Sequence, residues 1–216
     1  MPGIESFGRS ENEWKRRLAQ IEKQVQEENR PLADIALAII TAATTCRDAT
    51  KNLIQAADEK QRIEREVYIF YEFVYFFMHM TMRHAFPALT SARIAKLQEY
   101  LGSIIPSVAI DSYFAHWPED RKERMRSQFF EKLNDTEAEY TESTRFDSPL
   151  EGADRVSAKL QALFMKLASN VANWAVDDDQ AVSVLLPVSR VALGEWKSMH
   201  LDDLIAAVKD QTNIRW

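Results

Sequence analysis

The stretch VYIFYEFVYFFM, residues 67–78, decides the fold, because almost every position in it is apolar and bulky. It lies in a longer segment, about residues 59–86, that Pro87 brings to an end. A helix that is apolar nearly all round has to be buried on most of its sides. The sequence therefore predicts a central, aromatic-rich helix with the rest of the chain packed around it.

Glycine is scarce in this chain, and this scarcity indicates the fold class. Only 5 of 216 residues are Gly, and none lies between Gly8 and Gly102. Sheets of short strands and βα units need turn residues at regular intervals, so an all-β fold is excluded and a Rossmann or P-loop fold is disfavoured. We expect an all-α protein: residues 1–9 as a loose N-terminus and residues 10–216 as one compact bundle of six to seven helices.

Prolines divide the expected helices. Pro31, Pro87, Pro118 and Pro149 lie where helices begin or end, since the first turn tolerates a residue without an N–H group. Inside a helix, proline removes a hydrogen bond and clashes with the preceding turn. The sequence therefore predicts that the helices containing Pro106 and Pro187 are kinked or split.

The segment before the central helix, about residues 32–57, is rich in Ala and Thr. The sequence leaves open whether it is separate from helix 59–86, although ordinary helix lengths favour a break near Asp58. Small side chains facing large ones fill space well, so we expect the two to pack as an antiparallel pair with Phe73 and Phe77 buried.

An amphipathic helix is expected ahead of this pair, at about residues 11–29. Ser10 and Glu13 form a capping box at its start. Its apolar stripe consists of Trp14, Leu18, Ile21 and Val25. After the central pair, further helices are expected from Thr90 or Ser91, from Pro118, from Asp147 or Ser148, from about Asp179, and over residues 201–209.

One polar wedge interrupts the central helix and is the main candidate site. At helical spacing, Arg65 and four of the ligand-binding candidates fall on one narrow face, with the fifth beside it. The candidates are Tyr68, Glu72, Tyr75, His79 and Arg83. Facing a cavity, Glu72 and His79 would form an acid/base pair and Arg83 would hold an anion. The favoured interpretation is plainer: a solvent-facing strip or a satisfied internal network.

Other chemistry has little support in the sequence. The 4 His residues show no metal-ligand spacing, and Glu72 and His79 are about 10.5 Å apart along a helix axis, so we expect no metal and no cofactor. Cys46 among small residues is typical of a core position rather than of a nucleophile. The basic cluster of Arg121, Lys122, Arg124 and Arg126, interleaved with acidic residues, is typical of a solvated helix face.

Charge and hydropathy limit the partners. A net charge of -6 disfavours nucleic acid, and the longest apolar stretch, residues 67–82, is too short to span a membrane. With a single Cys, the chain is expected to be soluble and cytoplasmic. The leading hypothesis is a non-catalytic helical-bundle protein that acts by protein–protein interaction or self-association. The alternative is a small-molecule-binding protein or enzyme with its pocket at Glu72, His79 and Arg83.

Overall fold

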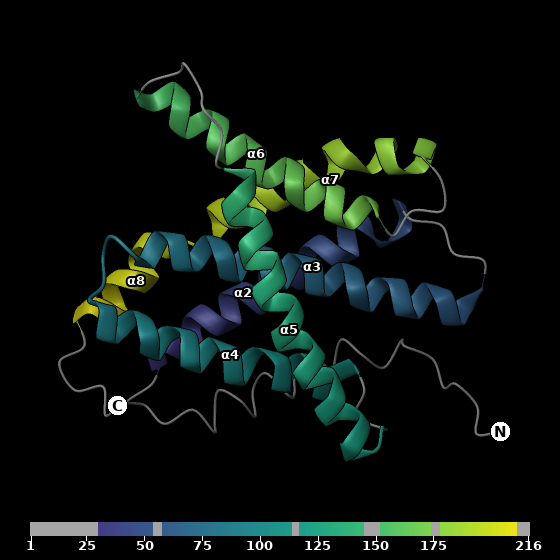
Figure 1. Cartoon of the computed structure of the whole chain (residues 1–216), viewed down its shortest axis with the longest axis horizontal. Coiled ribbons are helices and arrows are strands. Elements are labelled where there is room, and N and C mark those ends of the chain that lie inside the picture. Colours follow the sequence, from purple (N-terminus) through teal and green to yellow (C-terminus); the bar gives the residue numbers. More distant parts are fainter. Residues whose placement is uncertain (1–29, 54–57, 114–116, 145–151, 174–177, 211–216) are drawn as a thin grey trace.

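The structure is a computed structural model, and it describes residues 30–53, 58–113, 117–144, 152–173 and 178–210 (Figure 1). Within these ranges the chain is helical and contains no strand, which confirms the all-α prediction. The elements are α2 (Arg30–Thr50), η3 (Lys51–Leu53), α3 (Glu59–Ala85), α4 (Ser91–Tyr113), α5 (Glu119–Ser143), α6 (Gly152–Ala172), α7 (Asp178–Ser198) and α8 (Leu201–Asp210). The expected loose terminus at 1–9 and the helix at 11–29 lie outside the described residues.

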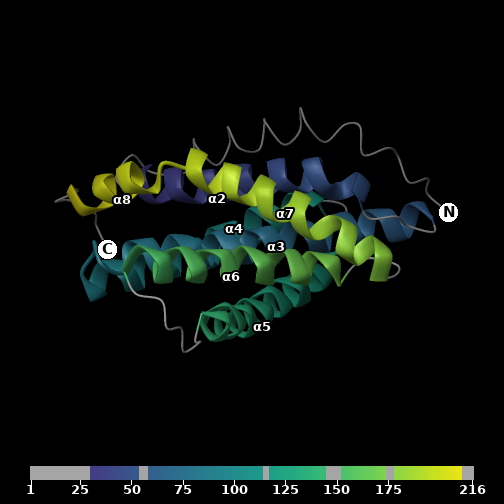
Figure 2. The same cartoon turned by 90° about the horizontal axis from the view of Figure 1, so that it is seen from above.

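Helix α3 is the centre of the bundle, as its composition predicts. Every side chain from residue 69 to residue 82 is buried. The helix packs against α2, α4, α5, α6 and α8, and Figure 2 shows it between α2 on one side and α5 on the other. A helix surrounded in this way has no face left for water, which is why it needs apolar residues all round.

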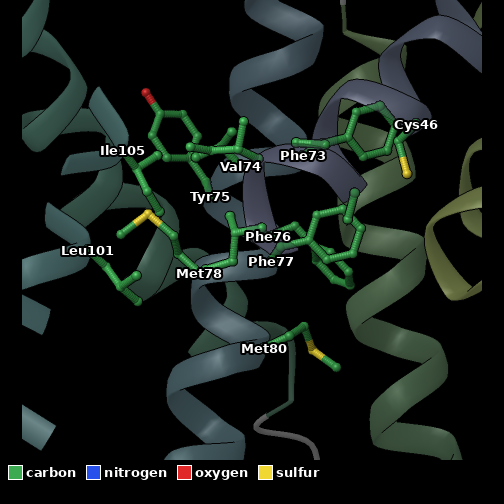
Figure 3. Close-up of a cluster of buried hydrophobic side chains, with 14 of the residues drawn as sticks. Cys46, Phe73, Val74, Tyr75, Phe76, Phe77, Met78, Met80, Leu101 and Ile105 are labelled. Atoms are coloured by element: carbon green, nitrogen blue, oxygen red, sulfur yellow. The ribbon is translucent and has the colours of Figure 1, made fainter. Parts of the chain in front are cut away.

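Helices α2 and α3 are separate and run in opposite directions (Figures 1 and 2). The break falls at the predicted place: Asp58 has extended backbone geometry and its side chain accepts a hydrogen bond from the amide of Gln61 at 2.8 Å. Phe73 and Phe77 are fully buried. Figure 3 shows the small side chain of Cys46 from α2 next to Phe73, as expected for small residues packed against large ones.

The sequence predicts that the helices containing Pro106 and Pro187 are kinked or split, and neither of them is split. Helix α4 continues through Pro106, and α7 continues through Pro187. Fully buried apolar residues flank each proline on the core side: Ile105 and Ala109 in α4, and Val184 and Val188 in α7. Packing of both flanking turns into one core holds each helix in register, which offsets the hydrogen bond that the proline removes.

Polar contacts secure the end of the bundle where α3, α4 and α8 meet (Figure 1). The ring nitrogen Nε2 of His84 lies 2.6 Å from Oδ1 of Asp202 on α8. The guanidinium of Arg93 donates to the backbone carbonyls of Val208 and Lys209, which end α8. A cation at the C-terminal carbonyls of a helix satisfies groups that have no partner within the helix.

The basic cluster of α5 is only half solvated, contrary to the prediction. Lys122 and Arg126 both reach Asp111 on α4, at 3.3 and 3.4 Å. Arg121 covers the ring of Trp117 at 3.4 Å, and Arg124 pairs with Asp120 on the surface. Two of the four cations therefore join α5 to α4.

Within the described part of the chain, no helix is long and apolar enough to cross a membrane.

Candidate functional site

The five candidate residues of α3 divide into a buried centre and two exposed ends. Glu72, Tyr75 and His79 are 6%, 4% and 2% exposed, whereas Tyr68 is 38% exposed and Arg83 lies at the surface. The wedge is therefore not a solvent-facing strip. Its centre is polar and lies inside the core.

Glu72 lies in a region where α3, α5 and α6 meet. Burial raises the pKa of its carboxyl from 4.5 to about 7, and the charge of Glu139 on α5 adds to the rise. Lys132 on α5, and Asn170 and Lys166 on α6, act in the opposite direction. Lys166 is itself paired with Glu139 at 3.2 Å. Close to neutral pH, the carboxyl of Glu72 is thus poised between its two protonation states.

Tyr140 and Asn170 complete this network and were not among the sequence candidates. Tyr140 is fully buried, and its ring lies 5.5 Å from that of Phe76 and 5.2 Å from that of His79. Its pKa is raised by burial, then by the charge of Glu72, while Asn170 lowers it. In the sequence, Tyr140 was only one member of the apolar stripe of its helix, and Asn170 lay among apolar residues with no distinguishing pattern.

Several polar atoms of the network lack a hydrogen-bond partner of good geometry among the described residues. They are Oε2 of Glu72, the hydroxyl of Tyr140, Nδ2 of Asn170 and Nε2 of His79. Buried polar groups usually have partners, and each one without a partner costs free energy. The network is therefore an expensive feature of the core.

His79 and Arg83 have partners of their own and are not joined to Glu72. Nδ1 of His79 lies 2.7 Å from Oε2 of Glu137, whose side chain is half exposed at the edge of α5. Arg83 donates to the hydroxyl of Thr144 at 3.4 Å. No hydrogen bond links Glu72 to His79 among the described contacts, so the geometry does not assemble the acid/base pair that the sequence suggested.

Cys46 and Tyr75 are buried side chains whose pKa values are raised. Burial, and then the charge of Glu195, raise the pKa of the Cys46 thiol well above its ordinary range, which is the opposite of an activated nucleophile. Burial likewise raises the pKa of Tyr75. Among the described residues, no group of three or more His, Cys, Asp or Glu side chains is arranged to hold a metal ion.

A groove lies elsewhere, between α2, α7 and α8. It has a volume of about 410 Å³. Its lining residues are Asp34, Leu37, Ala38, Thr41 and Ala42 from α2, Glu195, Ser198 and Met199 from α7, His200 at the junction, and Asp203 and Leu204 from α8. His200, between α7 and α8, has a φ of 49°, the left-handed conformation that ends many helices. The walls are mainly apolar, and three carboxylates border them.

The outer face of α7 is the second surface feature. Leu186 and Val182 are 77% and 69% exposed, more than any other large apolar side chain among the described residues. At 100° per residue, they share an arc of about 80° with Asp179 and Arg190, which are also exposed. Neither Asp179 nor Arg190 forms an ion pair with another described residue. We call Asp179, Val182, Leu186 and Arg190 the α7 strip.

The α7 strip borders α6. The hydroxyl of Ser189 lies 3.2 Å from the backbone carbonyl of Phe164 and 4.0 Å from the sulfur of Met165, which is 39% exposed. The apolar surface therefore continues from α7 onto α6.

The chain was compared with protein-family models, with curated proteins and with solved structures. None of the three comparisons found a match.

Proposed function

We propose that this chain is a non-catalytic helical-bundle protein that acts by protein–protein interaction, and that its α7 strip pairs with the same strip of a second copy. The observation that carries the proposal is the exposure of Leu186 and Val182 side by side on one helix face. Large apolar residues clustered at the surface are typical of contact sites between proteins.

The order of residues along the strip favours a second copy as the partner. An acidic residue, Asp179, lies at one end, a basic residue, Arg190, lies at the other, and the two apolar residues lie between them. When two such helices cross antiparallel about a twofold axis near Val184, Val182 of each copy faces Leu186 of the other. Arg190 then faces Asp179 of the second copy. A twofold interface requires such self-complementarity.

The buried network gives the alternative function less support. A pocket at Glu72, His79 and Arg83 would need its acid and base open to a ligand, but Glu72 and His79 are covered by α5 and α6. Nδ1 of His79 is already held by Glu137. We also propose that the protein is cytoplasmic, where the single Cys46 needs no disulfide partner.

The strip is small, so we expect a weak dimer. Stable interfaces bury about 1,200–2,000 Å² in total, and two large apolar residues from each copy contribute only part of that area. The full-length chain should therefore exchange between monomer and dimer as its concentration changes. Sedimentation equilibrium over a dilution series measures this exchange.

Charge reversal along the strip tests the twofold pairing. Arg190→Asp places acid against Asp179 of the second copy and should shift the protein to monomer. The double variant Asp179→Arg with Arg190→Asp restores opposite charges across the axis and should restore the dimer. Lys209→Asp on α8 makes the same charge change away from the strip and serves as the control.

Two results would overturn the proposal. One is a parent protein that stays monomeric up to a concentration of about 1 mM, because even a weak dimer is populated at that concentration. The other is an Arg190→Asp variant that dimerises as well as the parent protein. Leu186→Ser provides an independent check on the apolar part, with Phe86→Ser, a 60% exposed residue after α3, as its matched control.

A further inference from the structure

We propose that the groove between α2, α7 and α8 binds a small organic cation, a molecule that carries an ammonium group on an apolar body. This site is separate from the α7 strip, because Glu195, Ser198 and Met199 face the groove from the opposite side of α7. It therefore goes beyond the proposed dimer and does not depend on it. The size of the groove, its apolar floor and the charges at its rim support the assignment.

The groove has the size of a small-molecule site. Its volume is about 410 Å³, and pockets for small organic ligands commonly measure about 300–1,000 Å³. It lies where α2 packs against both α7 and α8 (Figure 2). Along α2 the lining extends from Asp34 to Ala42, which is about 12 Å of helix axis at 1.5 Å per residue. An elongated ligand therefore fits along α2.

The floor of the groove is apolar. Leu37, Ala38 and Ala42 contribute to it from α2, and Met199 and Leu204 contribute from the other side. Ala42 and Met199 are buried, whereas the other three are half-buried. Small alanine side chains leave room for a ligand, and the flexible thioether of a methionine adapts to its shape. The apolar body of a ligand gains free energy by leaving water for this surface.

The rim of the groove is acidic. Asp34 on α2, Glu195 on α7 and Asp203 on α8 each contribute a carboxylate, and none of the described lining residues is a lysine or an arginine. Neither Glu195 nor Asp203 forms an ion pair with another described residue. Asp34 lies 4.0 Å from the strongly exposed Arg30. An ammonium group in the groove would therefore meet carboxylates that the described part of the chain leaves largely uncompensated.

Two groups inside the bundle respond to the charge of this rim. Burial is the main cause of the raised pKa of Cys46, and the charge of Glu195 adds to it. Burial is also the main cause of the raised pKa of Tyr100, and the charge of Asp34 adds to it. In both cases a carboxylate of the rim disfavours a second negative charge. The same potential favours a positive charge in the groove.

The helix ends at the groove do not decide its sign. Helix α7 ends at Ser198 and α8 begins at Leu201, so a negative helix end meets a positive one and the two largely cancel. His200 lies between them and carries a positive charge only when it is protonated. The three carboxylates therefore set the sign of the potential.

The spread of the carboxylates favours an organic cation over a metal ion. Among the described residues, no group of three or more His, Cys, Asp or Glu side chains is arranged to hold a metal. A metal ion needs its ligands within about 2.0–2.6 Å, so they must converge on one point. An organic cation needs only a negative rim and an apolar surface for its body, and this groove supplies both.

A matched set of small compounds tests the roles of charge and of the apolar body. Octylammonium has both, octanol has the same chain without charge, octanoate has the opposite charge, and tetramethylammonium has the charge without the chain. Calorimetric titration of the full chain at pH 8 and low ionic strength measures their binding. We expect octylammonium to bind at least about tenfold more tightly than octanol or tetramethylammonium, and octanoate not to bind detectably. Added salt should weaken the binding of octylammonium.

Neutral variants locate the site. The double variant Glu195→Gln with Asp203→Asn keeps the size of both side chains and should weaken octylammonium binding about tenfold while leaving octanol binding unchanged. Glu131→Gln removes one exposed carboxylate from α5, on the other side of α3 (Figure 2), and should bind like the parent. Circular dichroism checks that each variant is folded.

A bulky side chain in the groove tests the site without changing its charge. Thr41 is exposed and lines the groove, so Thr41→Trp should fill the space and abolish octylammonium binding. Thr45→Trp, one turn further along α2 and outside the lining, is the matched control. The variant Arg190→Asp in the α7 strip should bind octylammonium like the parent, which separates this site from the proposed dimer.

Three results would overturn the proposal. Octanol that binds as tightly as octylammonium would show that charge has no role. Unchanged octylammonium binding in the Glu195→Gln, Asp203→Asn double variant would place the cation elsewhere. An octylammonium affinity that falls as the protein concentration rises, in the Arg190→Asp variant as well, would mean that a second copy occupies the groove.

Discussion

At the scale of single residues, Glu72 is the most unusual feature of the molecule. A carboxyl in an aromatic-rich core resists ionisation, because its charged form loses the solvation of water. Lys132 and Lys166 recover only part of that loss, as the net rise in its pKa shows. The residue therefore links protonation to the packing of α3 against α5 and α6.

This link predicts how the free energy of unfolding depends on pH. The folded pKa, about 7, lies above the ordinary 4.5, so between these values the folded state holds a proton that the unfolded state has lost. The contribution of Glu72 to stability is full below pH 4.5 and is lost as pH rises through 7. A shift of this size corresponds to about 3 kcal/mol. Urea unfolding at pH 5 and pH 8 measures the difference.

The variant Glu72→Gln isolates the effect of this one residue. Glutamine has nearly the same shape and does not ionise, so the variant should match the parent at pH 5 and be more stable than the parent at pH 8. Glu99→Gln, at the exposed partner of Lys96, should keep the pH dependence of the parent. If Glu72→Gln loses as much stability between pH 5 and pH 8 as the parent does, Glu72 is not the titrating group.

At the scale of helices, the start of α3 depends on one cap. Asp58 accepts a hydrogen bond from the amide of Gln61 in the first turn of α3, where the helix supplies no carbonyl one turn earlier. Asp58→Ala should lower the free energy of unfolding by about 1 kcal/mol, measured in urea. Asp58→Asn keeps a side-chain acceptor and should retain most of the stability. Equal losses for the two variants would show that the cap does not stabilise α3.

Helix boundaries and the central helix were predictable because their signals are local. The proline at 118 and the apolar run at 67–78 act within a few residues of their own positions, whereas the break near Asp58 followed from ordinary helix lengths. The helices are not split at Pro106 and Pro187 because the turns on both sides of each proline pack into the same core, which is a property of the assembled bundle. Tertiary packing overrides local preference in such cases.

The candidate site was only half predictable for the same reason. Spacing placed Glu72 and His79 on one face of α3, but their partners Glu137, Tyr140 and Asn170 belong to α5 and α6. Which helices surround α3 depends on their order in space. A single sequence carries no local pattern for that order. It therefore could not show that the wedge is buried, or that Glu72 and His79 have separate partners.

At the scale of the whole molecule, α3 connects the bundle. It packs against α2, α4, α5, α6 and α8, whereas the short α8 packs against α2 and α3 at one end of the molecule. A local opening of α3 would expose Phe70, Phe73, Phe76 and Phe77 together. We therefore expect α3 to open only when the whole bundle unfolds, and α8 to open at a lower cost.

Amide hydrogen exchange of the Phe73→Ala variant tests this expectation. Removing a fully buried ring should lower the free energy of unfolding by about 3–5 kcal/mol. Because α3 opens only with the bundle, exchange protection of its amides over residues 69–80 should fall by the same free energy that urea unfolding reports. Phe86→Ala, at a position 60% exposed, should change both quantities little. A drop in α3 protection much smaller than the drop in global stability would mean that α3 opens on its own, and the core would then consist of separable parts.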